Sequence, residues 1–315
     1  MKVRSFWRAV QVETEDPPYN TIHLKIYYPY FENELNAKQS QLPVVIFFNA
    51  VNCEARMYHW LAIELVESGA VVAMFNWVAN NPPGSINLSP GVDLDSWKKS
   101  YGKLPTASAL PSILNELEYL ESSEQLKGKI DLEKIILGGH SIGGRVALEN
   151  ADPDWFGAVK AAFSYGAHCL APIALGYARA TLRKLPSQLP VLLMGGTKDG
   201  VIAKSNSSYG LIGEDPISPL IGTFSEGFSS ENNDKYLVLF KGANHYSIAD
   251  SIDLTQENVY VDFPTTRPQS VYRDLIGKII ANFIQAFVCN DLLARAKLDR
   301  LLDFDLALIA KVDRK

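Results

Sequence analysis

The sequence Gly139-His140-Ser141-Ile142-Gly143 constrains the fold of this 315-residue chain more than any other feature. It has the pattern G-x-S-x-G and lies between Lys134–Leu137, which is typical of a short buried strand, and Arg145–Glu149, which is typical of a helix. Where a strand turns directly into a helix at a serine, side chains two positions before and after that serine would collide, which explains the two glycines. We therefore predict a strained strand-to-helix turn that pushes the Ser141 hydroxyl out of a sheet. Taken alone, so short a pattern also occurs in turns that only connect two elements.

Two further residues with functional chemistry follow other predicted strands. Asp199 comes shortly after the apolar run Leu189–Met194 and two glycines. His245 comes shortly after the apolar run Tyr236–Phe240 and one glycine. The order serine, acid, histidine along the chain is that of one known arrangement of a serine with a base and an acid.

These three residue types have complementary chemistry. A serine hydroxyl is a poor nucleophile until a base takes its proton, and an imidazole with a pKa of about 6.5 can do so near neutral pH. A carboxylate can orient the ring and stabilise the imidazolium that forms. We predict Ser141 as nucleophile, His245 as general base and acid, and Asp199 as the orienting acid, although each alone would more often be a solvated loop residue.

An oxyanion formed by attack of the serine needs two hydrogen-bond donors. One is expected to be the backbone amide of Ile142, which follows the nucleophile. The second is expected in the turn after the predicted strand Val44–Phe48. We place it at Val51, with Ala50 as the neighbouring candidate and as a residue of the substrate site; the alternative is an ordinary turn at the end of a strand.

Together these motifs resemble those of the α/β-hydrolase superfamily over about Leu42 to Val288. Within it the chain is most similar to the branch that holds dienelactone-hydrolase-like proteins, chlorophyllases, and cutinase-like and polyester hydrolases. The resemblance rests on five segments: Val44–Phe48, Ser68–Ala73, Gly139–Gly143, Gly196–Asp199 and Gly242–His245. It implies an α/β fold with a mostly parallel central sheet and helices on both faces. It also implies a serine hydrolase that cleaves a carboxylic ester through an acyl-enzyme, with no cofactor and no metal.

The chain departs from members of this branch at four positions that bear on the substrate. Chlorophyllases typically have arginine where Ile142 stands, dienelactone hydrolases proper have cysteine in place of Ser141, and many members carry His-Gly in place of Asn49-Ala50. The resemblance therefore implies an ester, expected to be hydrophobic, without naming it. Two alternatives stay open: a thioesterase, amidase or acyltransferase that uses the same three residues, and a ligand-binding protein without catalysis.

The sequence predicts one catalytic domain, residues 1–290, and a C-terminal extension, residues 291–315. Two antiparallel strands, Trp7–Glu13 and Thr21–Tyr28, are expected at its start. The apolar stripe in Val271–Phe287 predicts a helix packed on the sheet. The extension is expected to be an amphipathic helix, which packs on the domain by default and could instead mediate oligomer formation or touch a membrane surface.

Two long segments are expected to shape the substrate site. Residues 79–103 contain Trp97, and residues 168–189 begin with His168 and continue into an apolar cluster at Leu170. We predict Trp97, His168 and Leu170 as substrate-binding residues in a wall or lid, the equal alternative being side chains that only cover the sheet edge.

Charge and cysteine content exclude some functions. With a formal net charge of −5 and no basic run, we expect no nucleic-acid partner. Cys53, Cys169 and Cys289 lack the spacing of a zinc site or a disulfide framework. Because the chain also shows no signal peptide and no apolar stretch of about 18 residues, we expect a cytoplasmic protein without a transmembrane segment.

Overall fold

The computed structural model describes residues 1–14, 19–30, 41–81, 85–93, 98–99, 101–123, 125–229, 234–255, 257–305 and 307–315. Within these residues nine strands form one sheet in the order β1-β2-β4-β3-β7-β8-β9-β10-β11. The strands are β1 (Lys2–Glu13), β2 (Tyr19–Tyr30), β3 (Leu42–Phe48), β4 (Val71–Asn76), β7 (Ile130–His140), β8 (Val159–Tyr165), β9 (Val191–Gly196), β10 (Lys235–Phe240) and β11 (Ile309–Arg314).

The six central strands, β4-β3-β7-β8-β9-β10, are parallel to one another. Antiparallel strands complete both sides, with β1 and β2 at one edge and β11 at the other. The carboxyl ends of β7, β9 and β10 therefore meet at one edge of the sheet, and this is where ligands bind in open parallel sheets. Each of these three strands is followed by one of the predicted site residues.

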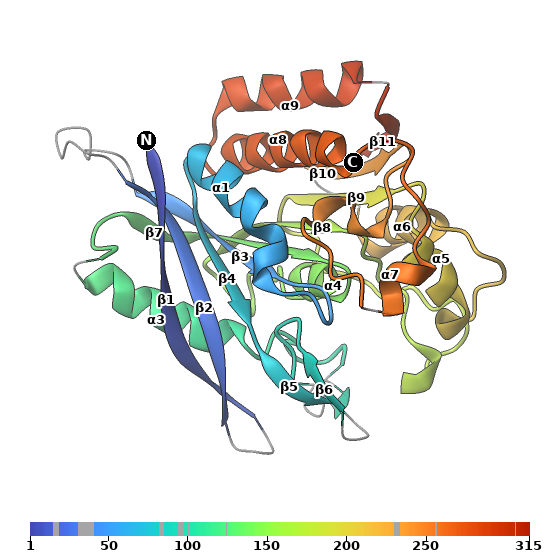
Figure 1. Ribbon diagram of the computed structural model, residues 1–315, viewed down its shortest axis with the longest axis horizontal. Coiled ribbons are helices and arrows are strands. Elements are labelled where there is room, and N and C mark those ends of the chain that lie inside the picture. The colour runs from blue at the N-terminus through green and yellow to red at the C-terminus, as the bar shows by residue number, and fades with distance from the viewer. Residues whose placement is uncertain are drawn as a thin grey trace.

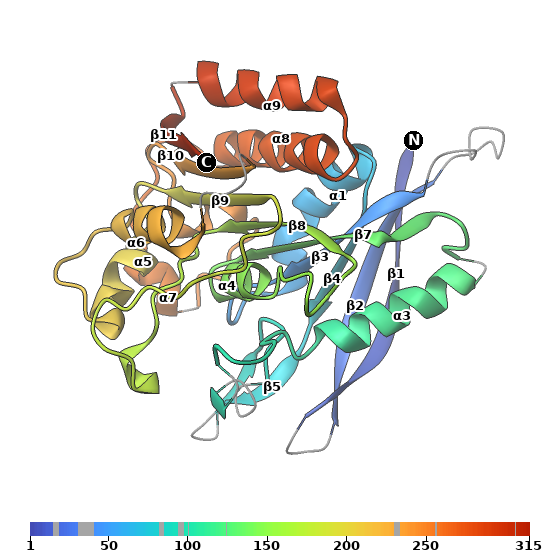
Figure 2. The same cartoon turned by 180° about the vertical axis from the view of Figure 1, so that it is seen from behind.

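Helices cover both faces of the sheet (Figures 1 and 2). On one face lie α1 (His59–Glu67) and α8 (Gln269–Phe287), with α9 (Leu292–Phe304) packed on α8; on the other lie α3 (Leu110–Ser122) and α4 (Ile142–Glu149). Strand β3 shows the pleat that separates the two cores: Val44, Ile46 and Phe48 belong to one, and Val45 and Phe47 to the other. The predicted mixed α/β fold with a mostly parallel sheet between helices is confirmed.

The C-terminal segment corrects one prediction. The sequence predicts a helix through residues 291–315, but the helix α9 ends at Phe304 and the chain then forms β11, antiparallel to β10. The backbone amide of Lys235 donates to the carbonyl of Lys315 at 2.7 Å, and the reverse bond is 3.0 Å. All six residues of β10 are buried, so without β11 an apolar strand would expose an unpaired edge. Tertiary pairing thus overrides the local helical pattern, and the end of the chain belongs to the sheet.

The long segment 79–103, which is expected to shape the substrate site, contains secondary structure of its own. It includes parts of a two-stranded antiparallel pair, β5 (Val78–Asn81) with β6 (Ser85–Leu88). Trp97 lies outside the described residues, so its predicted place at the substrate site is not tested.

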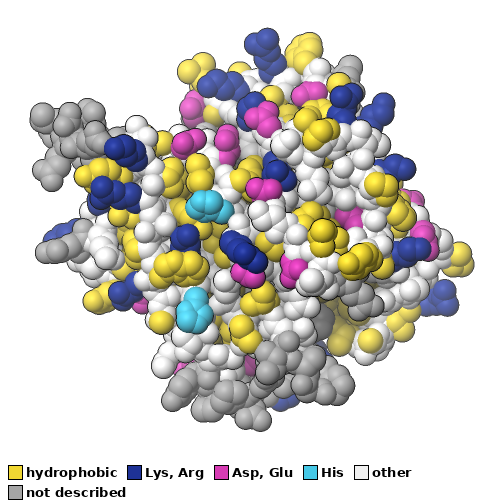
Figure 3. All heavy atoms as spheres, viewed as in Figure 1, with side chains coloured by type: hydrophobic (Ala, Val, Ile, Leu, Met, Phe, Trp, Pro, Cys, Tyr) yellow, Lys and Arg dark blue, Asp and Glu magenta, His cyan; other side chains and the backbone are white. Residues whose placement is uncertain are grey.

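The surface carries charges of both signs. On the face shown in Figure 3, Lys and Arg side chains are interspersed with Asp and Glu side chains. Every helix in the described part of the chain is too short or too polar to cross a bilayer.

Candidate active site

Ser141 occupies the single residue between the end of β7 and the start of α4. Its backbone has φ 56° and ψ −126°, a conformation that a residue other than glycine rarely adopts. The turn is held in place because the Ser141 amide donates to the carbonyl of Tyr165 at 2.9 Å, and its carbonyl accepts from the amide of Arg145 at 3.0 Å. The predicted strained strand-to-helix turn is present.

The glycines around Ser141 are required for the reason that the sequence suggests. A Cβ at Gly139 would lie 2.3 Å from the carbonyl oxygen of Gly143. A Cβ at Gly143 would lie 2.2 Å from the carbonyl oxygen of Phe48, at the end of β3. Strand and helix therefore approach each other too closely for any side chain at these two positions.

Asp199 and His245 form a buried, hydrogen-bonded pair. The Nδ1 atom of His245 lies 2.8 Å from Oδ2 of Asp199, and the histidine and the aspartate are 2% and 0% exposed. The other carboxylate oxygen, Oδ1, accepts the amide of Ile202 at 2.8 Å and so caps the helix α5 (Gly200–Ser205). With the Nδ1–H group of the neutral ring donating this hydrogen bond to the carboxylate, the Nε2 atom has a free lone pair and can act as a base.

The pKa of His245 reflects opposing causes. Burial alone would lower it, whereas the Asp199 carboxylate, through its charge and its hydrogen bond, and the charge of Asp262 raise it. The pKa lies above the usual 6.5, so the environment favours the protonated ring that a base forms on taking a proton.

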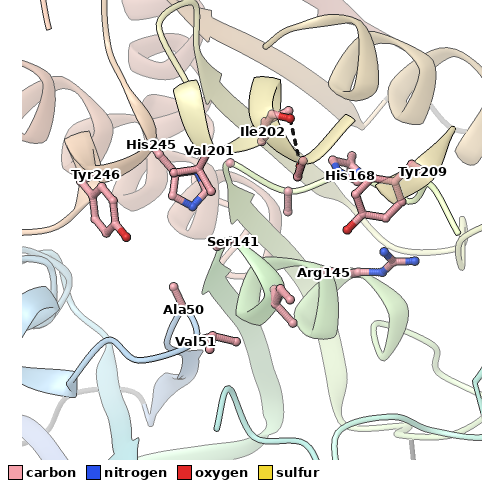
Figure 4. A pocket seen from close by; sticks show the side chains of 14 residues that line it. Ala50, Val51, Ser141, Arg145, His168, Val201, Ile202, Tyr209, His245 and Tyr246 are labelled. Atoms are coloured by element: carbon pink, nitrogen blue, oxygen red, sulfur yellow. Dashed lines mark hydrogen bonds between the residues drawn. The ribbon is translucent and has the colours of Figure 1, made fainter. Parts of the chain in front are cut away.

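Ser141 and His245 line the same pocket, of about 230 Å³. In Figure 4 the serine lies between the His245 ring and the turn at Ala50 and Val51. Among the hydrogen bonds of the described residues, none joins the Ser141 hydroxyl to His245. Such bonds are often long before a substrate binds, and a serine hydroxyl turns about one bond.

Both predicted oxyanion donors, the amides of Ile142 and Val51, belong to residues that line the pocket beside Ser141. Ile142 is the first residue of α4, so its amide has no acceptor within the helix. The Ala50 amide is 3.4 Å from the Tyr58 hydroxyl, whereas the Val51 amide has no acceptor among the described residues. Because Val51 also lines the pocket, it remains the preferred second donor.

The rest of the pocket wall combines apolar and polar side chains. Apart from Ser141 and His245 it consists of Ala50, Val51, Ile142, Arg145, Gly166, Ala167, His168, Val201, Ile202, Ser205, Tyr209 and Tyr246. His168, Tyr209 and Arg145 lie together at the end away from His245 (Figure 4). Burial is the largest cause that lowers the pKa of His168 to about 3, with the Arg145 and His245 charges adding to it, so this ring is neutral near pH 7.

Leu170 does not take its predicted place in this wall. Its side chain is buried, at 2% exposed, and lies outside the pocket lining. Its carbonyl accepts from Nη1 of Arg145 at 2.8 Å, and its amide is 3.3 Å from Nδ1 of His168. The prediction failed because the apolar cluster packs inward at Leu170 and then turns outward, so that Ile173 is exposed.

His140, the residue before Ser141, is fully buried and does not line the pocket. Its Nδ1 atom lies 2.8 Å from the Tyr58 hydroxyl, and its ring centroid is 4.6 Å from that of His245. Burial, together with the nearby His245, holds the pKa of His140 well below its usual range. The site therefore contains a second, neutral imidazole packed against the first.

Two further residues at the site belong to none of the predicted motifs. Gly166, after β8, has φ 63°, and a Cβ there would lie 3.0 Å from Nδ1 of His245 and 3.2 Å from Oδ2 of Asp199. Asp262, after the helix α7 (Glu257–Val261), accepts hydrogen bonds from the backbone of both loops that carry the pair. Sequence reasoning missed both, because only their neighbours in space reveal them.

The three cysteines lie in the described part of the chain and form no disulfide there. Cys53, Cys169 and Cys289 are free thiols, and burial raises the pKa of Cys53 to about 11, so this residue fills space beside the pocket and is not ionised near pH 7. Among the described residues, no group of three or more His, Cys, Asp or Glu side chains is arranged to hold a metal ion.

A scan against protein-family models found no match to this chain, and a search of curated proteins found no significant similarity. The function of the chain is therefore inferred from the geometry of the site.

Proposed function

We propose that this protein is a serine hydrolase of carboxylic esters with an α/β-hydrolase fold. One observation carries the proposal: Ser141, on a strained strand-to-helix turn, shares a pocket with His245, whose Nδ1 atom is hydrogen-bonded to the buried Asp199 carboxylate. This combination supports nucleophilic catalysis because it supplies a nucleophile, a base and a group that orients the base.

In the proposed reaction, Nε2 of His245 takes the hydroxyl proton as Ser141 Oγ attacks the ester carbonyl. The amides of Ile142 and Val51 donate to the oxyanion of the tetrahedral intermediate. The His245 imidazolium, stabilised by Asp199, then gives its proton to the leaving alcohol, and the acyl group stays on Ser141. Water, deprotonated by His245, attacks the acyl-enzyme; the bond between the acyl carbon and Ser141 Oγ breaks, the His245 imidazolium returns its proton to Oγ, and the carboxylic acid is released.

The size of the pocket favours a small substrate. Its 230 Å³ lies below the range of about 300 to 1,000 Å³ that is usual for sites of drug-sized ligands. Val51, Ile142, Val201 and Ile202 offer apolar contacts to a short hydrocarbon group. The neutral ring of His168 at the far end accepts from the Leu170 amide through Nδ1, so its Nε2 carries the proton and can donate to an oxygen of the substrate.

Hydrolysis of a series of p-nitrophenyl esters, from acetate to palmitate, tests this proposal. Wild-type protein should hydrolyse the short-chain esters fastest, and Ser141→Ala should lower kcat/KM by roughly 1,000-fold or more. Ser164→Ala is the matched control, because this serine is buried on the adjacent β8 and its hydroxyl has no partner in the described structure. Turnover by Ser141→Ala at the wild-type rate would contradict the proposal, and turnover of thioesters or amides in place of esters would favour the alternatives that use the same residues.

A further inference from the structure

We propose that Asp262 is a positioning residue for this reaction: its carboxylate holds the Asp199 loop and the His245 loop together, and its charge acts on the His245 ring. The inference rests on the proposed function, because it assigns Asp262 a part in that reaction. It adds a second acid to the site, one that lies outside the residues lining the pocket.

The hydrogen bonds of Asp262 reach both loops. Its Oδ1 accepts the amide of Gly200, the residue after Asp199, at 2.8 Å, and the amide of His245 at 3.3 Å. Its Oδ2 accepts the amide of Tyr246 at 3.3 Å. The Asp262 side chain thus bridges the backbone after β9 to the backbone after β10. These are the two loops whose residues Asp199 and His245 are joined by the 2.8 Å hydrogen bond between Oδ2 and Nδ1.

The backbone on either side of Asp262 packs closely against both loops. A Cβ at Gly200 would lie 2.4 Å from the carbonyl oxygen of Val261 and 2.6 Å from the amide nitrogen of Phe263. On the His245 side, Nδ2 of Asn244 donates to the carbonyl of Phe263 at 2.9 Å. The segment on either side of Asp262 is therefore held against both loops, and glycine at position 200 is what lets it come so close.

Asp262 also belongs to the electrostatic surroundings of His245. Among the described residues, the ionisable groups around His245 are Asp199 after β9, Asp262 after α7, the adjacent phenol of Tyr246, and the buried neutral rings His140 and His168. Of these only the two carboxylates favour a charged imidazole.

Asp262 itself titrates close to neutral pH. Burial is the largest cause that raises its pKa, to about 6; the nearby Asp199 charge raises it as well, while His245 and the backbone amides lower it. The phenols of Tyr165 and Tyr246, whose own pKa values lie above the usual 10, also face this carboxylate and stay uncharged. Above about pH 6 Asp262 is therefore mostly ionised and stabilises protonated His245.

Loss of the Asp262 charge should shift the pH dependence in one direction. Turnover needs neutral His245, so kcat/KM should rise with pH through the pKa of this ring. Removing the Asp262 charge should lower that pKa and move the acid limb of the profile to lower pH. A purely structural role would lower the plateau and leave the midpoint in place.

The test is the pH profile of kcat/KM for p-nitrophenyl acetate between pH 5 and 9, at constant ionic strength. For Asp262→Asn we expect the midpoint of the acid limb to move down by roughly 0.5 to 1 pH unit and the plateau to fall roughly tenfold or more. Asp250→Asn is the matched control, because Asp250 follows the His245 loop but pairs with Arg273. The pH profile of this variant should equal that of the wild type. An unchanged midpoint, or one that moves up, would overturn the inference.

A second variant covers the case in which Asp262→Asn does not fold. Asp262→Glu keeps the charge but displaces the carboxylate, so the plateau should fall while the midpoint stays near that of the wild type; an unchanged plateau would overturn the positioning role.

The wild-type protein distinguishes failure of this inference from failure of the proposed function. If it hydrolyses the ester through Ser141 and the Asp262 variants match it, only this inference fails, whereas if it does not hydrolyse esters, both fail.

Discussion

Gly166 illustrates how the candidate site depends on single residues that have no chemistry of their own. It follows β8 with φ 63°, and its Cα faces the hydrogen bond between His245 and Asp199. A methyl group here would press on both partners of that bond, at 3.0 and 3.2 Å. Glycine at this position therefore leaves the space that the hydrogen bond between His245 and Asp199 needs.

We accordingly predict that Gly166→Ala lowers kcat/KM for p-nitrophenyl acetate by roughly 10- to 100-fold, because the imidazole must shift by a few tenths of an ångström. Gly128→Ala is the matched control: this glycine has a similar φ of 67°, but nothing lies within 4 Å of its missing Cβ. Both variants introduce the same backbone strain, so comparable melting temperatures with unequal activity would support the role of Gly166. Equal activity in the two variants would contradict it.

Among single residues, the sequence predicts those with reactive side chains and misses those that act only by shaping or holding the site. Ser141, Asp199 and His245 have side chains whose types and order suggest a reaction, and the structure brings them together at one edge of the sheet. Gly166 and Asp262 act through the space that they leave or the backbone that they hold. No local pattern encodes such roles, because the partners are distant in sequence.

Among the elements, β11 departs most from what the sequence predicts. The strand β10 next to it is wholly buried and pairs with the parallel strand β9 on its other side. Lys235 and Lys315 exchange both backbone hydrogen bonds, so in an antiparallel ladder the amides at alternate positions of β11 point toward β10. By this alternation the Lys311 amide points toward Leu239, and the Val312 amide points away from the sheet.

Proline substitutions test this register. Lys311→Pro removes a hydrogen bond to β10 and should lower the free energy of unfolding by about 1 kcal/mol or more, a fall in melting temperature of roughly 2 to 4 °C. Val312→Pro removes an amide that faces outward and should cost less, even though it also loses a partly buried side chain. Differential scanning calorimetry measures both, and a larger loss for Val312→Pro would contradict the register.

In the whole molecule, the parallel sheet accounts for the assembly of the site. The sequence predicts the sheet well because its central strands are short apolar runs, each ending in glycine or in a polar loop. It cannot predict the 2.8 Å contact between Asp199 and His245, which depends on how adjacent β9 and β10 end. The fold brings the carboxyl ends of β7, β9 and β10 together. The proposed function depends on the side chain that follows each of these strands.

The measurement that tests this account most directly is covalent labelling by a fluorophosphonate, a probe that reacts with serines activated by a neighbouring base. Intact-mass spectrometry followed by peptide mapping should show one adduct per chain, located on Ser141. The adduct should be absent in Ser141→Ala and form much more slowly in His245→Ala, while Ser164→Ala should label like the wild type. A wild-type protein that stays unlabelled, or that carries the adduct on another residue, would contradict the assignment of Ser141 as an activated nucleophile.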